Sequence, residues 1–303
     1  MNYKKIFRSQ QLRFEILHLL RWVPDSWMLP LQYKIKLGRW PNLKSPKRWT
    51  EKLQLYKMYY RNPVMPRCVD KYEVRKYIEE KGLSEYLVEL YGVWENANDI
   101  DFNSLPNSFV LKTTDGGGGE NVIIVSDKTK ENLQVIRNKL NSWLDRKNVN
   151  AGREWAYTGI RKSQIIAEQL LVNVKYPEAG VEDFKILCFD GEVKYIIVDK
   201  DRYINHKRNF YSPQWKRKCV TTDHEQFEDY YPKPENFEKM LELAHELSKD
   251  FPFVRVDLYN VCGKIYFGEL TFYPWTGYVQ FSPDSFDFEL GEFMDCSSFI
   301  IKK

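Results

Sequence analysis

Two stretches near the end of the chain decide the fold: Val254–Tyr259, which reads VRVDLY, and Lys264–Thr271, which reads KIYFGELT. Both are rich in β-branched and aromatic residues, and a short glycine-containing segment separates them, so they predict a β-hairpin. If Val261–Gly263 forms a three-residue loop, Asn260 pairs with Lys264. A shift of one residue in either strand would move its side chains to the opposite face.

Four polar side chains are expected on one face of this hairpin, because side chains alternate along a strand. They are Arg255, Asp257, Glu269 and Thr271. Two carboxylates, a guanidinium and a hydroxyl on one face suit a hard cation and a phosphate. The alternative is a half-exposed hairpin whose polar face is solvated. The aromatic run Phe272–Gly277, directly after the second strand, favours a pocket wall.

Length and composition bound the class of protein. A chain of 303 residues can bury a full core and is expected to hold two or three lobes. No run approaches the roughly 18 apolar residues of a membrane span, and no signal peptide is expected. Five cysteines without C-x-x-C spacing indicate reduced thiols, and four scattered histidines disfavour a zinc site. These features predict a cytoplasmic protein.

Charge is distributed unevenly along the chain. Residues 1–50 hold eleven Lys and Arg against Glu15 and Asp25, a net charge of +9, whereas the whole chain carries +4. We expect residues 1–65 to form a basic, helical extension that wraps on the main body. Its tryptophans and basic residues suit contact with anionic lipid or an anionic polymer. A solvated basic helix packed on the body is the alternative.

Two lysines stand where an anion would be expected. Asp70 and Glu73 can cap a helix, and Lys71 in its first turn opposes the helix dipole unless it meets an anion. Lys112 ends a strand just before four glycines, and a second strand follows. Bare glycine N–H groups suit a loop that closes over phosphates, although no Gly-Lys-Ser/Thr follows as in a Walker loop. An exposed lysine and an ordinary glycine hairpin are the alternatives. The glycines are Gly116, Gly117, Gly118 and Gly119.

The middle of the chain predicts two more strand regions. Gln164–Leu171 reads as a buried strand that turns polar at Glu168, where its edge can offer backbone groups to an adenine ring. An ordinary strand exit is the alternative. Asp183–Phe189 leads through Asp-Gly, the strongest short turn signal, into a second strand. Lys185 lies on the same face as Asp183.

A basic, aromatic segment follows at residues 201–218 and is predicted to be a loop. Guanidinium groups and aromatic faces together suit an anionic sugar or a nucleic-acid backbone, with a merely solvated loop as the alternative. The candidate substrate residues are Arg202, His206, Lys207, Arg208 and Trp215.

Together these motifs, in this order, resemble the ATP-grasp superfamily. Their residue sequences are most similar to its TupA-like branch of teichuronopeptide and capsule gene clusters. The resemblance covers roughly residues 50 to 280. The segments that carry it are Val69–Arg75 (VDKYEVR), Leu105–Lys112 (LPNSFVLK) with its glycines, Glu168, Glu182–Gly191 (EDFKILCFDG) and Val254–Pro274.

The resemblance implies an α+β fold in which two lobes, residues 66–171 and 172–303, grip ATP between antiparallel sheets. It assigns the triphosphate to Lys71 and Lys112, with the glycines closing over it. The family usually has Asn where this chain has Thr271, so the second-metal role there is open. The remaining implied roles are adenine binding by Glu168, Gln169, Leu170 and Leu171; nucleotide binding by Asp183; two magnesium ions on Asp257, Glu269 and Thr271; and catalysis by Lys185 and Arg255.

The activity implied is that of an ATP-dependent carboxylate–amine ligase that works through an acyl phosphate. The implied substrates are an amino acid or other amine and a uronic acid of a bacterial surface polysaccharide, either lipid-linked or polymeric. The chain would act in the cytoplasm, with contact at the inner face of the membrane as a further hypothesis. No nucleic acid is expected.

Two other classes of function remain as alternatives. Asp99-Ile100-Asp101 and Asp199-Lys200-Asp201 match the loose D-x-D pattern of glycosyltransferases, although no strand–glycine-rich–helix nucleotide unit accompanies them. The basic N-terminal region alone would suit a polyanion or RNA binder. As a polyanion or RNA binder, the protein would have no use for the carboxylates Asp257 and Glu269 of the hairpin.

Overall fold

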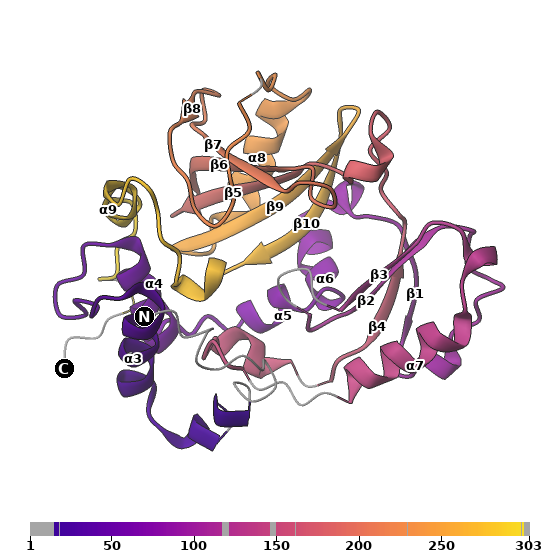
Figure 1. Cartoon of the computed structure of the whole chain (residues 1–303), viewed down its shortest axis with the longest axis horizontal. Coiled ribbons are helices and arrows are strands. Elements are labelled where there is room, and N and C mark those ends of the chain that lie inside the picture. Colours follow the sequence, from indigo (N-terminus) through magenta and orange to yellow (C-terminus); the bar gives the residue numbers. More distant parts are fainter. Residues whose placement is uncertain are drawn as a thin grey trace.

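The computed structural model describes residues 15–17, 19–116, 121–145, 150–160, 162–228, 230–297 and 299. Two antiparallel sheets with helices around them form the body, which confirms the α+β class (Figure 1). The four-stranded sheet has the order β1-β4-β2-β3, and the six-stranded sheet has the order β10-β9-β5-β6-β7-β8. The divisions at residues 65 and 171 stay predictions. The strands are β1 Leu90–Trp94, β2 Phe109–Thr113, β3 Val122–Val125, β4 Ile165–Glu168, β5 Asp183–Phe189, β6 Glu192–Lys200, β7 Lys207–Tyr211, β8 Arg217–Lys218, β9 Phe253–Val261 and β10 Lys264–Thr271.

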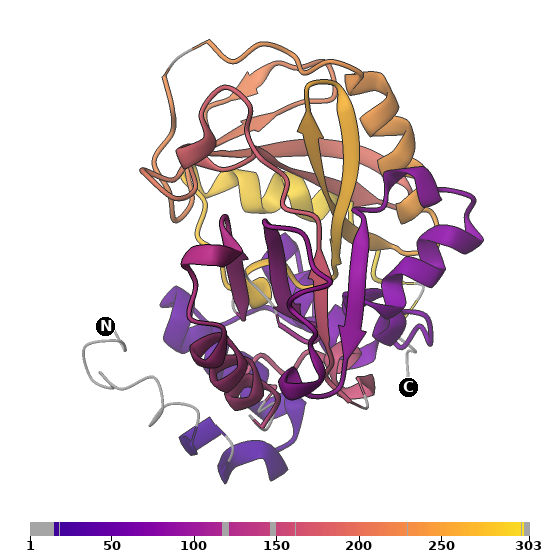
Figure 2. The same ribbon diagram turned by 90° about the vertical axis from the view of Figure 1, so that its right-hand side faces the viewer.

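Helices α7 and α8 cover the outer sides of the two sheets, whereas α5 and α6 lie between the sheets (Figure 1). Helix α7 packs on the four-stranded sheet, and α8 packs on the six-stranded sheet. The β9–β10 hairpin lies on the side of its sheet that is turned towards the four-stranded sheet (Figures 1 and 2). The α-helices named in the text are α3 Asp25–Leu37, α4 Trp49–Tyr59, α5 Met65–Val69, α6 Glu73–Glu80, α7 Leu133–Leu144, α8 Phe237–Ser248 and α9 Ser285–Glu292. Three 3-10 segments are η1 Leu20–Trp22, η5 Trp155–Gly159 and η7 Pro274–Gly277.

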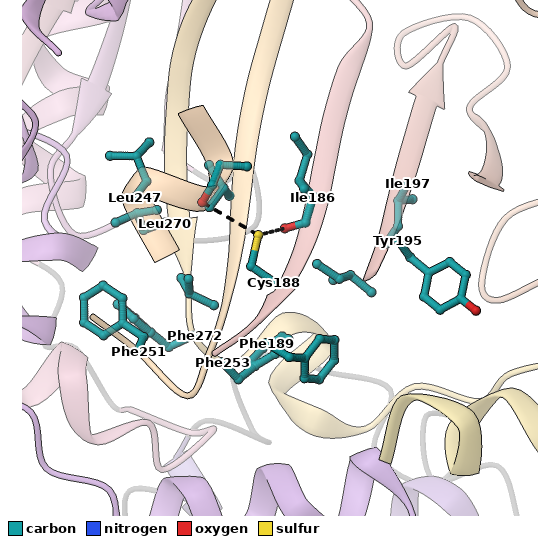
Figure 3. Packing of buried hydrophobic residues seen from close by; sticks show 14 of the residues in the cluster. Ile186, Cys188, Phe189, Tyr195, Ile197, Leu247, Phe251, Phe253, Leu270 and Phe272 are labelled. Carbon is teal, nitrogen blue, oxygen red and sulfur yellow. Dashed lines mark hydrogen bonds between the residues drawn. The ribbon is translucent and has the colours of Figure 1, made fainter. Parts of the chain in front are cut away.

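A large hydrophobic core holds the six-stranded sheet in place. Figure 3 shows its centre, where aromatic side chains such as Phe251, Phe253 and Phe272 pack against the aliphatic residues of β5 and α8. The Cys188 thiol lies among them and faces the carbonyls of Ile186 and Ala244 at 3.7 and 3.9 Å. Because this layer is apolar, the polar residues of the same strands must project from the opposite face.

The β9–β10 hairpin differs from its expected register in two places. Its turn holds two residues, Cys262 and Gly263, which both have positive φ, so Lys264 pairs with Val261 and the predicted pairing with Asn260 is wrong. A bulge at Gly268 then adds one unpaired residue to β10. The shift of the turn and the bulge together leave Glu269 opposite Asp257.

The N-terminal region is attached to the main body by helix packing and by buried hydrogen bonds. Helices α3 and α4 lie within the segment predicted to be a helical extension, and α4 packs on α9 from the far end of the chain. Asp287 of α9 is buried and accepts hydrogen bonds from Thr50 N at 2.9 Å and Thr50 Oγ1 at 2.8 Å. Arg48 pairs with Asp284 at 2.6 Å. Acidic residues of α9 and of the position just before it therefore anchor the basic extension.

Residues 201–218 are not the loop that was predicted. They contain strands β7 and β8, and Arg208, Phe210 and Tyr211 of β7 are buried. Phe210 and Tyr211 have high β-propensity, and the open edge of β6 supplies backbone partners for this segment. Within the described ranges, no helix is both long and apolar enough to cross a membrane.

Candidate active site

Five polar side chains of the six-stranded sheet form one connected cluster, named here the carboxylate cluster: Arg255, Asp257, Glu269, Thr271 and Lys185. Arg255 donates to both oxygens of Asp257, at 2.6 Å from Nε and 2.7 Å from Nη2. The same Nη2 lies 3.1 Å from Glu269 Oε1 and 3.0 Å from Thr271 Oγ1. The shared face predicted for the first four residues is therefore observed.

Lys185 links the hairpin to the neighbouring strand. It stands directly opposite Asp257 in the pairing of β5 with β9, and its Nζ lies 2.9 Å from Asp257 Oδ2. The same ammonium group also donates to Asp183, whose Oδ2 accepts a second bond from Arg202 at 3.0 Å. Charges of alternating sign thus continue across β10, β9 and β5, which offsets the cost of burying each of them.

Burial and mutual attraction set the ionisation of this cluster. Burial opposes ionisation of Glu269, but the charges of Arg255, Lys185 and Lys71 outweigh it and lower the pKa of Glu269 to about 2. Burial raises the pKa of Asp257 to about 6, against the opposing effects of Arg255 and Lys185. Burial alone would lower the pKa values of Arg255 and Lys185, but the neighbouring carboxylates raise both. Glu269, Arg255 and Lys185 are therefore charged at neutral pH, and Asp257 is mainly ionised there because its pKa lies below 7.

The four-stranded sheet contributes a second group of charged residues. Lys112 of β2 lies 2.7 Å from Glu168 Oε2 of β4, and Arg75 of α6 lies 3.4 Å from the other oxygen. Glu168 is buried, so its carboxylate is held between two cations. No role was predicted for Arg75. It stands four residues after Lys71, and a helix that included both residues would place them on the same side.

Lys71 lies between the two groups. Its backbone N–H donates to Thr114 O at 3.0 Å, and its ammonium group donates to the carbonyl of Gly116. Burial lowers the pKa of Lys71, while the charge of Glu269 opposes this and that of Lys112 adds to it. The helix begins two residues later than expected, and the Asp70 carboxylate accepts from the N–H groups of Tyr72 and Glu73 at 2.8 and 2.9 Å.

Part of the predicted nucleotide site falls outside the described residues. Gly116 is described and buried, whereas Gly117, Gly118 and Gly119 lie outside the described ranges. Gln169, Leu170 and Leu171 follow the last paired residue of β4 and are half-buried. The Gln169 N–H donates to Glu89 O at 2.9 Å. Their roles in binding adenine stay predictions.

The five substrate candidates do not form one group. Arg202 joins the carboxylate cluster through Asp183, whereas Arg208 is buried and pairs with Asp199 at 2.6 and 2.8 Å and with Asp223 at 2.6 Å. His206 lies 3.3 Å from the same Asp199. Trp215 stacks on Tyr211 and packs against the core, and Lys207 is half-buried in β7. The prediction that Arg208 and Trp215 are presented on an open loop is wrong, because both are used in packing.

Asp199 is buried and paired with Arg208, whereas an aspartate of a D-x-D motif would have to be accessible to a metal and a nucleotide sugar. Burial opposes its ionisation, but Arg208 and His206 outweigh this effect and hold the pKa of Asp199 well below its usual range. A carboxyl group with a depressed folded-state pKa stabilises the fold above its unfolded pKa of about 3.9, and the contribution is lost as pH falls below that value.

Asp199→Asn is therefore expected to destabilise the protein by about 3 kcal/mol at pH 7, because it leaves the Arg208 guanidinium short of a buried partner. The difference from the unaltered chain should shrink as pH falls from about 4 to 3. Urea unfolding midpoints measured between pH 7 and 3 test this. Asp101→Asn, at an exposed position, is the control and should leave the midpoint unchanged at each pH. A pH-independent difference would contradict the ionisation argument.

The carboxylate cluster fits magnesium in the chemistry of its oxygens. Asp257 Oδ2 already accepts from Arg255 and Lys185, whereas Oδ1 accepts only from Arg255 among the described residues. Glu269 Oε1 accepts from Arg255 and Thr271. Asp257 and Glu269 therefore retain oxygen lone pairs for a hard cation. Across the described ranges, no group of three or more His, Cys, Asp or Glu side chains lies at metal-binding spacing, so further ligands would have to come from bound phosphate or water.

Several solved structures and one family model are similar to this chain. No curated protein matches the chain. Similar solved structures include the D-alanine–D-alanine ligases of Bacillus anthracis (21% identity, TM-score 0.38, covering 67% of this chain and 56% of that one) and Helicobacter pylori (15%, 0.41, 75% and 61%). An L-amino acid ligase from Bacillus licheniformis is 16% identical, with a TM-score of 0.39 and coverage of 70% and 42%. The chain thus spans about half the length of these structures. The model of the TupA-like ATP-grasp family matches residues 51–295, and the chain therefore belongs to that family.

Proposed function

We propose that this chain is an ATP-dependent ligase that joins a carboxylate to an amine. The observation that carries the proposal is the carboxylate cluster, in which Asp257 and Glu269 are held by Arg255 and Lys185. Burying charged groups costs desolvation free energy, and apolar side chains in their place would often stabilise the fold as well or better. The carboxylate cluster is well suited to neutralising the charge of a nucleotide triphosphate, and the family assignment supports that use.

In the proposed reaction, a substrate carboxylate attacks the γ-phosphate of ATP, so that the bond to the β-phosphate oxygen breaks and ADP leaves. The amine then attacks the acyl phosphate, loses a proton and displaces inorganic phosphate. Lys71 and Lys112 would bind the triphosphate, and the strand exit at Glu168–Leu171 would hold adenine. Magnesium, held by Asp257 and Glu269, would screen the phosphate charge.

Arg255 and Lys185 would have two duties in this scheme. In the unliganded chain they hold the carboxylates in place, at 2.6 Å and 2.9 Å from Asp257. With nucleotide bound, the same cations would lie close to the transferring phosphoryl and to the oxyanion formed when the amine attacks. Thr271 donates to Glu269 at 3.0 Å and would orient that carboxylate.

For substrates, we propose an amino acid or other amine and the uronic acid of a bacterial surface polysaccharide or its precursor. Support comes from the resemblance of the sequence motifs to the TupA-like branch and from Arg202, which reaches the carboxylate cluster through Asp183 at 3.0 Å. A guanidinium group can bind a sugar carboxylate in a bidentate manner. ATP availability would place the reaction on the cytoplasmic side.

A thermal-unfolding assay with Mg-ATP, Mg-ADP and several UDP-sugars tests the nucleotide class. A ligand at about a hundred times its dissociation constant should stabilise the protein by roughly 2.7 kcal/mol. Lys112→Ala is expected to remove the ATP-dependent shift, because it removes an ammonium group assigned to the triphosphate. Lys162→Ala, which breaks an exposed pair with Glu95 near the same sheet, is the matched control and should keep the shift.

The pattern of shifts separates the possible outcomes. Stabilisation by ATP and ADP that disappears in Lys112→Ala supports the ligase and justifies screening uronic acids and amino acids for ADP release. Stabilisation by a UDP-sugar alone would favour a glycosyltransferase. An equal ATP shift in Lys112→Ala would remove Lys112 from the site.

A further inference from the structure

Helix α3 presents a row of large apolar side chains to solvent. Trp27, Leu31 and Ile35 follow one another at intervals of four residues, so they lie on one side of the helix, and they expose 76%, 44% and 47% of their surface. The helix already has a buried side, which carries its packing. The outward row therefore lies outside the buried side of the helix. The buried side is formed by Met28, Leu29, Gln32, Tyr33 and Leu37.

This row is part of a larger surface, named here the α3 patch: Leu19, Trp22, Trp27, Leu31, Ile35 and Trp40. Sixteen large hydrophobic side chains are exposed among the described residues, and these six fall within a segment of 22 residues. Three of them are tryptophans with 62–78% of their surface exposed. Scattered exposed apolar residues are normal, but such concentration marks an interaction surface.

The α3 patch sits on a rigid base. Tyr33 Oη and Thr50 Oγ1 of α4 lie 2.8 Å apart, and Gln32 accepts from Tyr278 Oη at 2.8 Å. The helix ends at Gly38, which has a φ of +76° and whose N–H donates to Lys34 O. In Figure 1, α3 lies at the edge of the molecule opposite α7. Helix α3 is therefore already folded and fixed in place, so a partner could bind the apolar row without first ordering the helix.

The charge around the α3 patch selects the partner. Arg21, Lys34 and Lys36 flank the exposed side chains, and the nearby Asp25 is already paired with Arg153 at 2.7 Å. The first 50 residues carry a net charge of +9. A second copy of the chain would bring this positive charge against itself, whereas an anionic surface would be attracted.

We propose that the α3 patch binds the surface of an anionic lipid bilayer, with α3 lying in the plane of the interface. Tryptophan and leucine side chains would enter the boundary between headgroups and acyl chains, and the flanking basic residues would meet lipid phosphates. Tryptophan favours this depth because its ring is apolar and its N–H is polar. The proposal does not rest on the ligase assignment.

Flotation of the full chain with liposomes tests the proposal. We expect binding to vesicles of phosphatidylcholine containing phosphatidylglycerol, weaker binding to phosphatidylcholine alone, and weakening with added salt. The double variant Trp27→Ser/Leu31→Ser should lower the partition coefficient by about tenfold or more, because it removes two large apolar groups. Its unfolding midpoint should stay unchanged.

The matched control is Val135→Ser/Tyr230→Ser, which removes apolar side chains that are 59% and 87% exposed elsewhere on the molecule. It should bind like the unaltered chain. Equal binding by Trp27→Ser/Leu31→Ser would overturn the proposal and leave the basic residues 1–14 as the contact. Failure to bind anionic vesicles would overturn it as well, as would a concentration-dependent dimer that this double variant abolishes.

Discussion

Glu269→Gln is expected to reduce ATP-dependent ADP release by about 10²-fold or more, because the amide keeps the shape of the side chain and removes its charge. The structure gives this carboxylate two partners, Arg255 Nη2 at 3.1 Å and Thr271 Oγ1 at 3.0 Å. Its pKa of about 2 leaves it ionised throughout the physiological range. The measurement is the rate of ADP release at saturating Mg-ATP, over a series of magnesium concentrations.

The control for this experiment is Glu192→Gln, which alters an exposed glutamate of β6 in the same sheet. Its ADP release and magnesium dependence should match those of the unaltered chain. The far-ultraviolet circular dichroism of both variants should be unchanged, since neither substitution alters a core side chain. Full activity in Glu269→Gln, at every magnesium concentration, would remove Glu269 from the metal site.

The second large effect concerns stability and follows from Lys185. Its ammonium group is buried between Asp183 and Asp257, so Lys185→Met would leave two buried carboxylates with less compensation. Breaking a buried ion pair by removing one partner costs about 3–5 kcal/mol. We therefore expect a lower urea midpoint at pH 7 with an unchanged m-value.

Lys194→Met provides the comparison on the adjacent strand. Lys194 pairs with Glu192, whose side chain is 70% exposed, so solvent compensates for the lost partner. Its midpoint should lie close to that of the unaltered chain. If Lys185→Met were equally stable, the carboxylates around it would have to be neutral in the folded chain, and the charged cluster described above would be wrong.

The local features of the site could be predicted from the sequence. Alternation along a strand is a property of the backbone, so Arg255 and Asp257 had to share a face, as did Asp183 and Lys185. Asp190 and Gly191 have φ values of +48° and +81°, the left-handed conformations that the Asp-Gly signal predicts. Membership in the ATP-grasp family was likewise readable from the order of short motifs, and the family match confirms it.

Partners distant in sequence could not be predicted in this way. The basic segment after residue 201 was predicted to be an open loop because its guanidinium groups and aromatic side chains suit an anionic ligand. Arg208 is nevertheless buried, because Asp199 lies opposite it in the pairing of β6 with β7. Similarly, Asp287 met Thr50 only through the packing of α9 on α4. A charge is solvated or buried according to such contacts, and one local stretch does not contain them.

By itself, the sequence determined strands β2 to β6, β9 and β10, the face shared by alternate residues within each of them, and the family. The tertiary structure decided which of these residues stand opposite each other. The two-residue turn and the bulge at Gly268 each shift the register by one residue, and together they align Glu269 with Asp257. The tertiary structure also decided which side of α3 is left exposed. Propensity and alternation act over a few residues, whereas register and burial depend on contacts between segments far apart in the chain.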